Sequence, residues 1–185
     1  MTLALRFLLS STTTSRLDEH VLRPYCHWFS HQRNNENLFR PITFPDAIPR
    51  NRQNFHLLEG DFLQLRPPSP STTTGDSGYD YIVTLFFIDT SLDVLSTIQH
   101  IHHLLRPGGK WINLGPLLWT GGSEAKVELC LAEVLQAVEL LGFVLQTDVG
   151  QPTSPRTVEC EYTSDRTAMM RWTYKAEFWV ATKSK

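Results

Sequence analysis

Two apolar stretches with an amphipathic stretch between them dominate the middle of the chain. The first, Tyr79–Thr90, consists mostly of apolar, aromatic and β-branched residues up to Asp89. This pattern predicts a buried strand that ends at an acidic residue. Apolar residues then recur every three or four positions over Val94–Leu105, which predicts a helix. A Pro-Gly-Gly turn at 107–109 leads into a second apolar run at 111–116. The pattern predicts a βαβ unit whose polar residues gather at the carboxyl edge of its parallel strands.

Weaker patterns predict the remaining elements. Residues 3–22 have apolar positions compatible with a helix, and we expect the first eleven residues to form a core helix. Thr90 and Asp93 have the spacing of a capping box for the following helix, and Gly108–Gly109 would end that helix in a left-handed turn. The other expected elements are a short strand at Phe55–Leu58, a helix at Ser123–Leu141 that ends at Gly142, a strand at Phe143–Val149 and a final antiparallel edge strand at Lys175–Thr182.

Prolines and small polar residues mark the segments that lack regular structure. Pro41, Pro45 and Pro49 recur every four residues and exclude a helix there, because proline removes a backbone donor and clashes with the preceding turn. From Arg66 to Gly78 the chain is almost entirely Pro, Ser, Thr, Gly and Asp, a composition that cannot bury apolar area. We expect a single domain over residues 1–185, with 66–78 as a mobile surface insertion.

Charge and cysteine usage exclude several classes of function. The 185 residues include 17 Lys plus Arg and 19 Asp plus Glu, without a long basic run, so nucleic acid is not an expected partner. No stretch reaches the roughly 18 to 20 apolar residues that cross a bilayer, and the apolar N-terminus lacks the basic start of a signal peptide. The three cysteines form no Cys-x-x-Cys pair. We therefore expect a soluble protein with reduced thiols and no membrane partner, cytoplasmic or also nuclear.

Four short motifs are more specific than the order of the elements. They are Gly60-Asp61-Phe62, Phe86-Phe87-Ile88-Asp89-Thr90, Trp111-Ile112-Asn113-Leu114-Gly115-Pro116-Leu117-Leu118, and Met169-Met170 followed by Trp172 and Tyr174. Together with the loop at 40–46 they resemble the carnosine N-methyltransferase family, also called the N2227-like family, over nearly the whole chain. The resemblance implies an α/β fold that is the C-terminal part of a Rossmann-like class I methyltransferase sheet with flanking helices.

The same resemblance implies an enzyme that transfers a methyl group from S-adenosylmethionine to the histidine imidazole of carnosine, which makes anserine. Asp89 matches a substrate-binding aspartate, which would accept an imidazole N–H and be the catalytic residue. Tyr162 and Tyr174 match substrate-lining positions. The matches to the family's cofactor-binding positions are Asp61, Phe62 and Leu85. The implied partner is a small molecule or short peptide that contains histidine; no metal is implied, and a homodimer is left open.

The chain departs from the family in two places. It has neither the Gly-rich turn after the first strand nor the acidic residue at the end of the second, so we expect the first two strands to be missing and the cofactor to bind weakly. After Leu118, where the family has a substrate-contacting histidine, the chain reads Trp119-Thr120-Gly121-Gly122. Two hypotheses follow: an N-terminally incomplete enzyme of this family, or a non-catalytic remnant that binds a partner or regulates a complete paralogue through an exposed sheet edge.

Each candidate residue also has a purely structural explanation. Asp61 belongs to a Gly-Asp pair, which is common in turns, and Asp89 is placed to cap the next helix. Any single aromatic residue, including the two tyrosines, is more often a packing residue than a binding group. His100 and His103 share a helix face without an acidic or cysteine partner, which favours a solvated helix face over a metal site.

Overall fold

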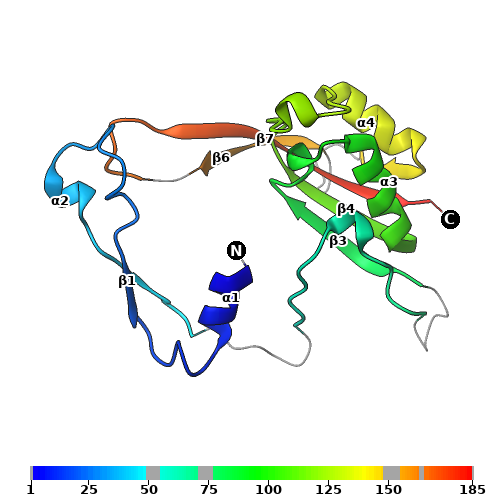
Figure 1. Ribbon diagram of the computed structural model, residues 1–185. Helices are drawn as coiled ribbons and strands as arrows, with labels where there is room; N and C mark the ends of the chain where they lie inside the picture. Colours follow the sequence, from blue (N-terminus) through cyan, green and yellow to red (C-terminus); the bar gives the residue numbers. More distant parts are fainter. Residues whose placement is uncertain (1, 49–54, 71–76, 148–154, 163–164, 185) are drawn as a thin grey trace. The chain divides into compact units, whose positions relative to one another are not determined.

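The computed structural model describes residues 2–48, 55–70, 77–147, 155–162 and 165–184 (Figure 1). Contacts divide them into two units. Met1–Gly60 with Thr163–Trp172 form one, called the amino-terminal unit below, and Asp61–Tyr162 with Thr173–Lys185 form the other, called the sheet unit. The expectation of a single domain stays a prediction. Residues 71–76 of the expected insertion lie outside the described residues, and 66–70 are irregular.

The sheet unit is built on five strands. They are β3 (Tyr79–Leu85), β4 (Leu105–Gly115), β5 (Phe143–Leu145), β6 (Arg156–Tyr162) and β7 (Trp172–Lys183). The order is β3-β4-β7-β5, and β6 also pairs with β7. β3 and β4 are parallel and α3 (Val94–Leu104) joins them, which confirms the βαβ unit. β7 is antiparallel to β4 and β5, as predicted, but its expected edge position is wrong because strands pair on both of its sides.

Two helices cover one face of this sheet. α3 and α4 (Leu131–Leu140) turn their buried residues toward the face that carries Trp111 and Trp179, whose rings meet edge to face at 5.6 Å. The helix residues in this core include Val94, Ile98, Ile101, Val134 and Val138. Their spacing of three and four residues is the amphipathic pattern seen in the sequence. The arrangement is a mixed α/β sheet with flanking helices, as the fold class predicted.

The ends of the helices differ from the predictions. Asp93 alone caps α3: its carboxylate accepts from the Ser96 N–H at 3.0 Å, while the Thr90 hydroxyl donates to the Phe87 carbonyl, so the capping box is wrong. α3 then passes directly into β4, and Gly108, at φ +73°, lies in an irregularity of that strand instead of ending the helix.

α4 begins at Leu131 instead of Ser123, and Gly122–Glu124 form a separate 3₁₀ turn, η3. The N–H groups of Lys126 and Val127 donate to the Leu92 carbonyl, which holds the residues before α4 in an extended form. The predicted stop of α4 at Gly142, φ +94°, is confirmed. Of the predicted strand at Phe143–Val149, only Phe143–Leu145 is a strand, and residues 148 and 149 lie outside the described residues.

A buried polar chain links β3 to β4 inside the core. The Trp111 indole N–H donates to the Thr84 hydroxyl at 2.8 Å, and that hydroxyl donates to the Asn113 amide oxygen at 2.8 Å. All three side chains are buried. Because buried polar groups are costly when unpaired, this chain of hydrogen bonds ties the register of the two strands to the packing of the core.

The opposite face of the sheet is open at β3. Tyr81, Val83 and Leu85 alternate along this strand and are 63%, 68% and 62% exposed. Among the described residues β3 pairs with β4 alone, so its other edge presents unpaired N–H and C=O groups. This exposed edge of the sheet, with its three apolar side chains, is called the β3 edge below.

The amino-terminal unit has little regular structure. It contains α1 (Thr2–Leu9), β1 (His20–Leu22), α2 (Asn35–Leu38) and β2 (Ile42–Phe44), with β1 antiparallel to β2. The predicted helix over 3–22 is therefore wrong beyond Leu9, and Leu3 is 81% exposed, so α1 is not a core helix. Residues 55–58 are irregular and not the expected strand. None of the helices in the part of the chain that the structure describes is long and apolar enough to span a bilayer.

Candidate active site

Asp89 lies where β3 ends, in the short 3₁₀ turn η2 (Ile88–Thr90). The residue is only 6% exposed, and its Oδ2 accepts a hydrogen bond from the Leu118 N–H at 3.0 Å. Leu118 belongs to the loop that follows β4. The carboxylate thus joins the carboxyl ends of two parallel strands, which is the edge where open α/β sheets bind ligands.

Burial changes the acidity of this group. Desolvation raises the pKa of Asp89 above its ordinary value, and hydrogen bonds from the backbone N–H groups of Leu118 and of Asp89 itself oppose the shift only in part. The cap of α3 is Asp93, so the explanation of Asp89 as the cap of that helix is wrong. A buried carboxylate with a raised pKa at a sheet edge is better suited to accept a proton than an exposed one is.

The backbone next to Asp89 is tightly packed. Phe86 has a left-handed φ of 49°, uncommon for a bulky residue, and its N–H donates to the Leu114 carbonyl at 2.8 Å. A Cβ atom on Gly115 would lie 3.1 Å from the N and Cα atoms of Phe86. The Phe86 ring meets Tyr174 of β7 edge to face at 5.7 Å. This contact brings one predicted substrate-lining residue beside the loop that carries Asp89.

Asp61 and Phe62 lie together in another part of the sheet unit. Asp61 caps the 3₁₀ turn η1 (Phe62–Gln64) by accepting from the Leu63 N–H at 3.0 Å, so its structural role as a turn residue is confirmed. The Phe62 ring packs edge to face on Phe87 and on His100, both at 5.1 Å. The Asp61 and Phe62 side chains line a cavity of about 420 Å³, together with Phe87 and Thr90.

This cavity fits one end of the implied cofactor. A carboxylate can accept from the exocyclic amine of an adenine, and a phenyl ring can pack on its face. Asp61 and Phe62 supply both groups in one place. The 185 residues contain no Gly-x-Gly sequence, the turn that was expected to hold the methionine end.

Two of the predicted residues are not brought to that cavity. Leu85 ends β3 on the exposed face of the sheet and does not line the cavity of Asp61. Tyr162 is the last residue of β6, and its side chain lies outside what the structure describes. Thr120, in the stretch 119–122 where the resemblance led us to expect a histidine, is exposed.

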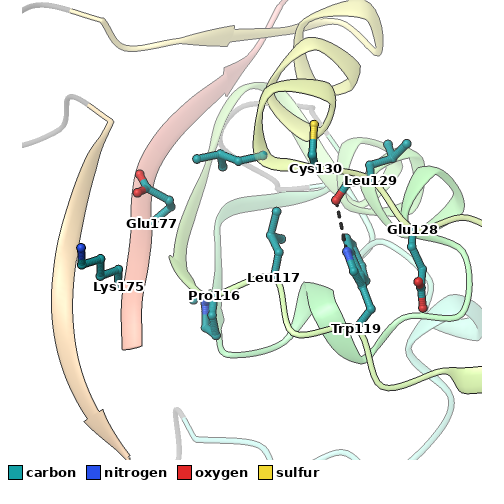
Figure 2. Close-up of a pocket in the computed structure, with 10 residues that line it drawn as sticks. Pro116, Leu117, Trp119, Glu128, Leu129, Cys130, Lys175 and Glu177 are labelled. Carbon is teal, nitrogen blue, oxygen red and sulfur yellow. Dashed lines mark hydrogen bonds between the residues drawn. The ribbon is translucent and has the colours of Figure 1, made fainter. Parts of the chain in front are cut away.

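A second cavity, of about 530 Å³, opens at the carboxyl end of β4 and was not predicted (Figure 2). Leu117 and Trp119 form part of its wall, on either side of the Leu118 amide that Asp89 holds. The Trp119 indole N–H donates to the Leu129 carbonyl at 3.1 Å, which fixes the ring. Its charged lining residues are Glu128, Lys175 and Glu177. The sequence signal for these residues was the spacing of Lys175 and Glu177, which puts both on one face of a strand. Their place at this cavity follows from the pairing of Glu177 with Gly115, which the sequence does not show.

The histidines of α3 behave differently from one another. His103 is exposed, but His100 packs on Phe62 and its Nε2 is buried without a hydrogen-bond partner among the described residues, so a solvated face is wrong for His100. In the described ranges, His, Cys, Asp and Glu side chains form no group of three that could hold a metal ion.

Comparison with known proteins identifies the family. A family model described as carnosine N-methyltransferase matches residues 1–185. The chain belongs to this family. The carnosine N-methyltransferase of Schizosaccharomyces pombe is 30% identical over 184 residues, which cover 91% of this chain and 46% of that protein. The Rattus norvegicus carnosine N-methyltransferase is 34% identical over 175 residues, covering 91% of this chain and 40% of the relative. The chain thus spans less than half the length of these members of the family.

Proposed function

We propose that this chain is part of an S-adenosylmethionine-dependent N-methyltransferase that acts on a histidine imidazole and converts carnosine to anserine. The observation that carries the proposal is the buried carboxylate of Asp89 at the carboxyl end of β3, in a chain whose relatives are named carnosine N-methyltransferase. Substrate and reaction come from those names, and the residue roles come from the resemblance of the motifs to the family, supported at Asp89 by its burial and position.

Asp89 would act on the imidazole ring. By accepting the N–H of one ring nitrogen, its carboxylate selects the tautomer whose other nitrogen has a free lone pair. S-adenosylmethionine, held by Asp61 and Phe62, would supply the methyl group from a sulfonium, whose sulfur would keep the electron pair of the S–C bond. As the new N–C bond forms, the opposite ring nitrogen becomes acidic and its proton passes to Asp89. The raised pKa of this carboxyl favours that transfer.

The other residues would hold the two reactants. We assign Tyr174, whose ring contacts that of Phe86, and Tyr162 to the wall that packs on the imidazole ring. Asp61 and Phe62 would hold the adenine, and we assign Leu85 to the wall of the cofactor site. Such positioning accounts for much of the rate of an in-line displacement. We expect the reaction in the cytoplasm, since all three cysteines are free thiols as in a reducing compartment.

The β3 edge bears on the fold of the whole enzyme. A Rossmann-like class I methyltransferase sheet needs further strands, and an unpaired strand with alternating exposed apolar residues is suited to receive one. We propose that polypeptide outside these 185 residues pairs there as the first strands of the sheet. The same edge supports a second candidate function, that of a non-catalytic subunit that binds a partner through strand addition.

The test joins this chain to the part of the fission yeast relative that it does not match, as one polypeptide and by co-expression. Each product is incubated with S-adenosylmethionine and carnosine, and mass spectrometry locates the added methyl group. Methylation on the imidazole ring is expected, and Asp89→Asn should reduce it severely. An assembly that forms and binds cofactor but leaves carnosine unmethylated would favour the second candidate function instead.

A further inference from the structure

The Phe62 ring, which lines the cavity assigned above to adenine, is held in place by side-chain packing. Among the described residues, 61–65 form hydrogen bonds only with one another. The Leu63 N–H donates to the Asp61 carboxylate, and the N–H groups of Gln64 and Leu65 donate to the carbonyls of Asp61 and Phe62. None of these bonds joins the turn η1 to the rest of the sheet unit. The side chains that touch the Phe62 ring therefore decide where it lies.

Two rings from separate elements contact Phe62. Phe87 meets it edge to face, with the ring centroids 5.1 Å apart and the planes at 77°. His100 meets it in the same way, at 5.1 Å and 87°. Phe87 comes directly before η2, the turn that carries Asp89, whereas His100 belongs to α3. Edge-to-face pairs are a favoured geometry for aromatic rings, so the two contacts together define the tilt of the Phe62 ring.

His100 stands next to the cavity without lining it. Ser96 and Thr97 of α3 are lining residues. His100 follows them by four and three positions, and residues at these spacings share one side of a helix. The imidazole is absent from the lining itself, although it touches the Phe62 ring that forms part of it. A ligand in the cavity would thus be influenced by His100 through Phe62.

The shape of the imidazole matters here more than its polarity. Nε2 of His100 is buried and has no hydrogen-bond partner among the described residues. A buried polar atom without a partner costs stability, so this nitrogen does not explain why a histidine is tolerated at the position. The flat ring, by contrast, contacts Phe62 in a favoured geometry. A phenylalanine at position 100 would offer the same edge-to-face contact without the unpaired nitrogen.

We propose that His100 is a positioning residue for the cofactor, whose ring holds Phe62 in the orientation that receives the adenine. The inference rests on the proposed function, which assigns Asp61 and Phe62 to the adenine. Without the ring at position 100, Phe62 loses one of its two edge-to-face contacts and must be ordered when the cofactor binds. Ordering one side chain is enough to weaken binding by about threefold to tenfold.

Calorimetric titration with S-adenosylmethionine tests this in the polypeptide joined to the fission yeast segment. His100→Leu keeps an apolar side chain but no ring, and its affinity should fall about threefold to tenfold. His100→Phe restores the ring and should bind within about twofold of the parent. Gln99→Leu, at an exposed position of the same helix, is the matched control and should also keep the affinity. Full affinity of His100→Leu would overturn the proposal, and so would His100→Phe binding as weakly as His100→Leu.

This measurement is separate from the test of the proposed function, because no carnosine is present. A joined polypeptide that binds the cofactor but does not methylate carnosine would contradict the proposed reaction, while the affinities of the His100 variants would still decide the role of this residue.

A second measurement uses the 185-residue chain without cofactor. Carbon-13 NMR relaxation of the Phe62 ring reports its motion on the picosecond to nanosecond timescale. The ring should move more in His100→Leu than in the parent chain or in His100→Phe. Urea unfolding should show no loss of stability in His100→Leu, because the change removes a buried nitrogen that has no partner. Equal motion of the Phe62 ring in all three chains would overturn the proposal.

Discussion

The carboxylate of Asp89 accepts the N–H of Leu118 across 3.0 Å, although the two residues are separated by the whole of α3 and β4. Leu117 and Trp119, the neighbours of Leu118, line the cavity at the end of β4 (Figure 2). The same side chain that we propose as proton acceptor therefore also positions a wall of that cavity. Its two roles are separable by experiment, since an amide can replace the carboxylate as acceptor for Leu118.

We expect Asp89→Asn to reduce methyl transfer by on the order of 100-fold or more in the completed enzyme, because the amide keeps the hydrogen bond to Leu118 but cannot take the imidazole proton. The measurement is turnover with carnosine, alongside cofactor binding, which should change little. Asp80→Asn is the control, since Asp80 is in the same strand but exposed in an ion pair with Arg106. Near-normal turnover of Asp89→Asn would show that the residue only positions the loop.

The pH dependence of stability gives an independent test of the buried carboxyl. Burial raises the pKa of Asp89, so the folded state binds this proton more tightly than the unfolded state does. The ionised group therefore costs stability at neutral pH, and the cost is lost as the pH falls through the raised pKa toward the ordinary value of 3.8. Urea unfolding should show the wild type gaining stability relative to Asp89→Asn as the pH is lowered. A difference that stays constant with pH would contradict the assignment.

Gly115→Ala should destabilise the sheet unit by on the order of 1 to 3 kcal/mol. The added Cβ would press on the backbone of Phe86 at 3.1 Å, and backbone yields less readily than the end of a side chain. Gly60→Ala is the matched control, because nothing lies within 4 Å of a Cβ at that position. Urea unfolding of the two variants measures the difference. Equal stabilities would mean that the turn at Phe86 relaxes freely.

Thr84→Val should cost about 1 to 3 kcal/mol of unfolding free energy, because it leaves the Trp111 N–H and the Asn113 amide oxygen without their shared partner. Valine has nearly the same shape and suits a strand, so packing is preserved. The same change at exposed Thr120 should stay within about 0.5 kcal/mol. If both variants unfolded alike, the buried chain would contribute nothing beyond packing.

Cofactor binding by the 185-residue chain alone should be weak or undetectable. Asp61 and Phe62 fit the adenine end, but the chain has no Gly-rich turn for the rest of the molecule. Calorimetric titration with S-adenosylmethionine measures it, and affinity should rise when the missing part of a relative is supplied. Micromolar binding by this chain alone would show that the Gly-rich turn is not needed.

The βαβ unit could be predicted because each of its parts has a local pattern, with a period of 3.6 residues in α3 and a mostly apolar sequence in β3. The start of α4 could not be predicted. The residues before Leu131 have the apolar content of a helix. The N–H groups of Lys126 and Val127 instead donate to the Leu92 carbonyl, and this keeps the segment extended. β6 has charged residues at 156, 159 and 161 and no apolar run, and it pairs with β7.

In the candidate site, too, some residues have a local sequence signal and others are brought together only by long-range strand pairing. The position of Asp89 after an apolar run is a local signal, its role at the substrate came from the resemblance to the family, and its raised pKa follows from burial in the structure. The cavity of Lys175 and Glu177 depends on which residue of β7 faces Gly115, a register that is set by two strands far apart in the sequence.

The β3 edge has a consequence for handling the protein. A strand with open hydrogen-bonding groups and exposed apolar residues at every second position is a template for cross-β stacking. When the chain is synthesised, pairing of β3 with a covering strand competes with stacking of β3 between identical copies of the chain. Stacking depends on the concentration of the chain, whereas a covering strand on the same polypeptide pairs independently of it. The yield of soluble protein at increasing expression levels therefore tests whether another strand pairs with β3.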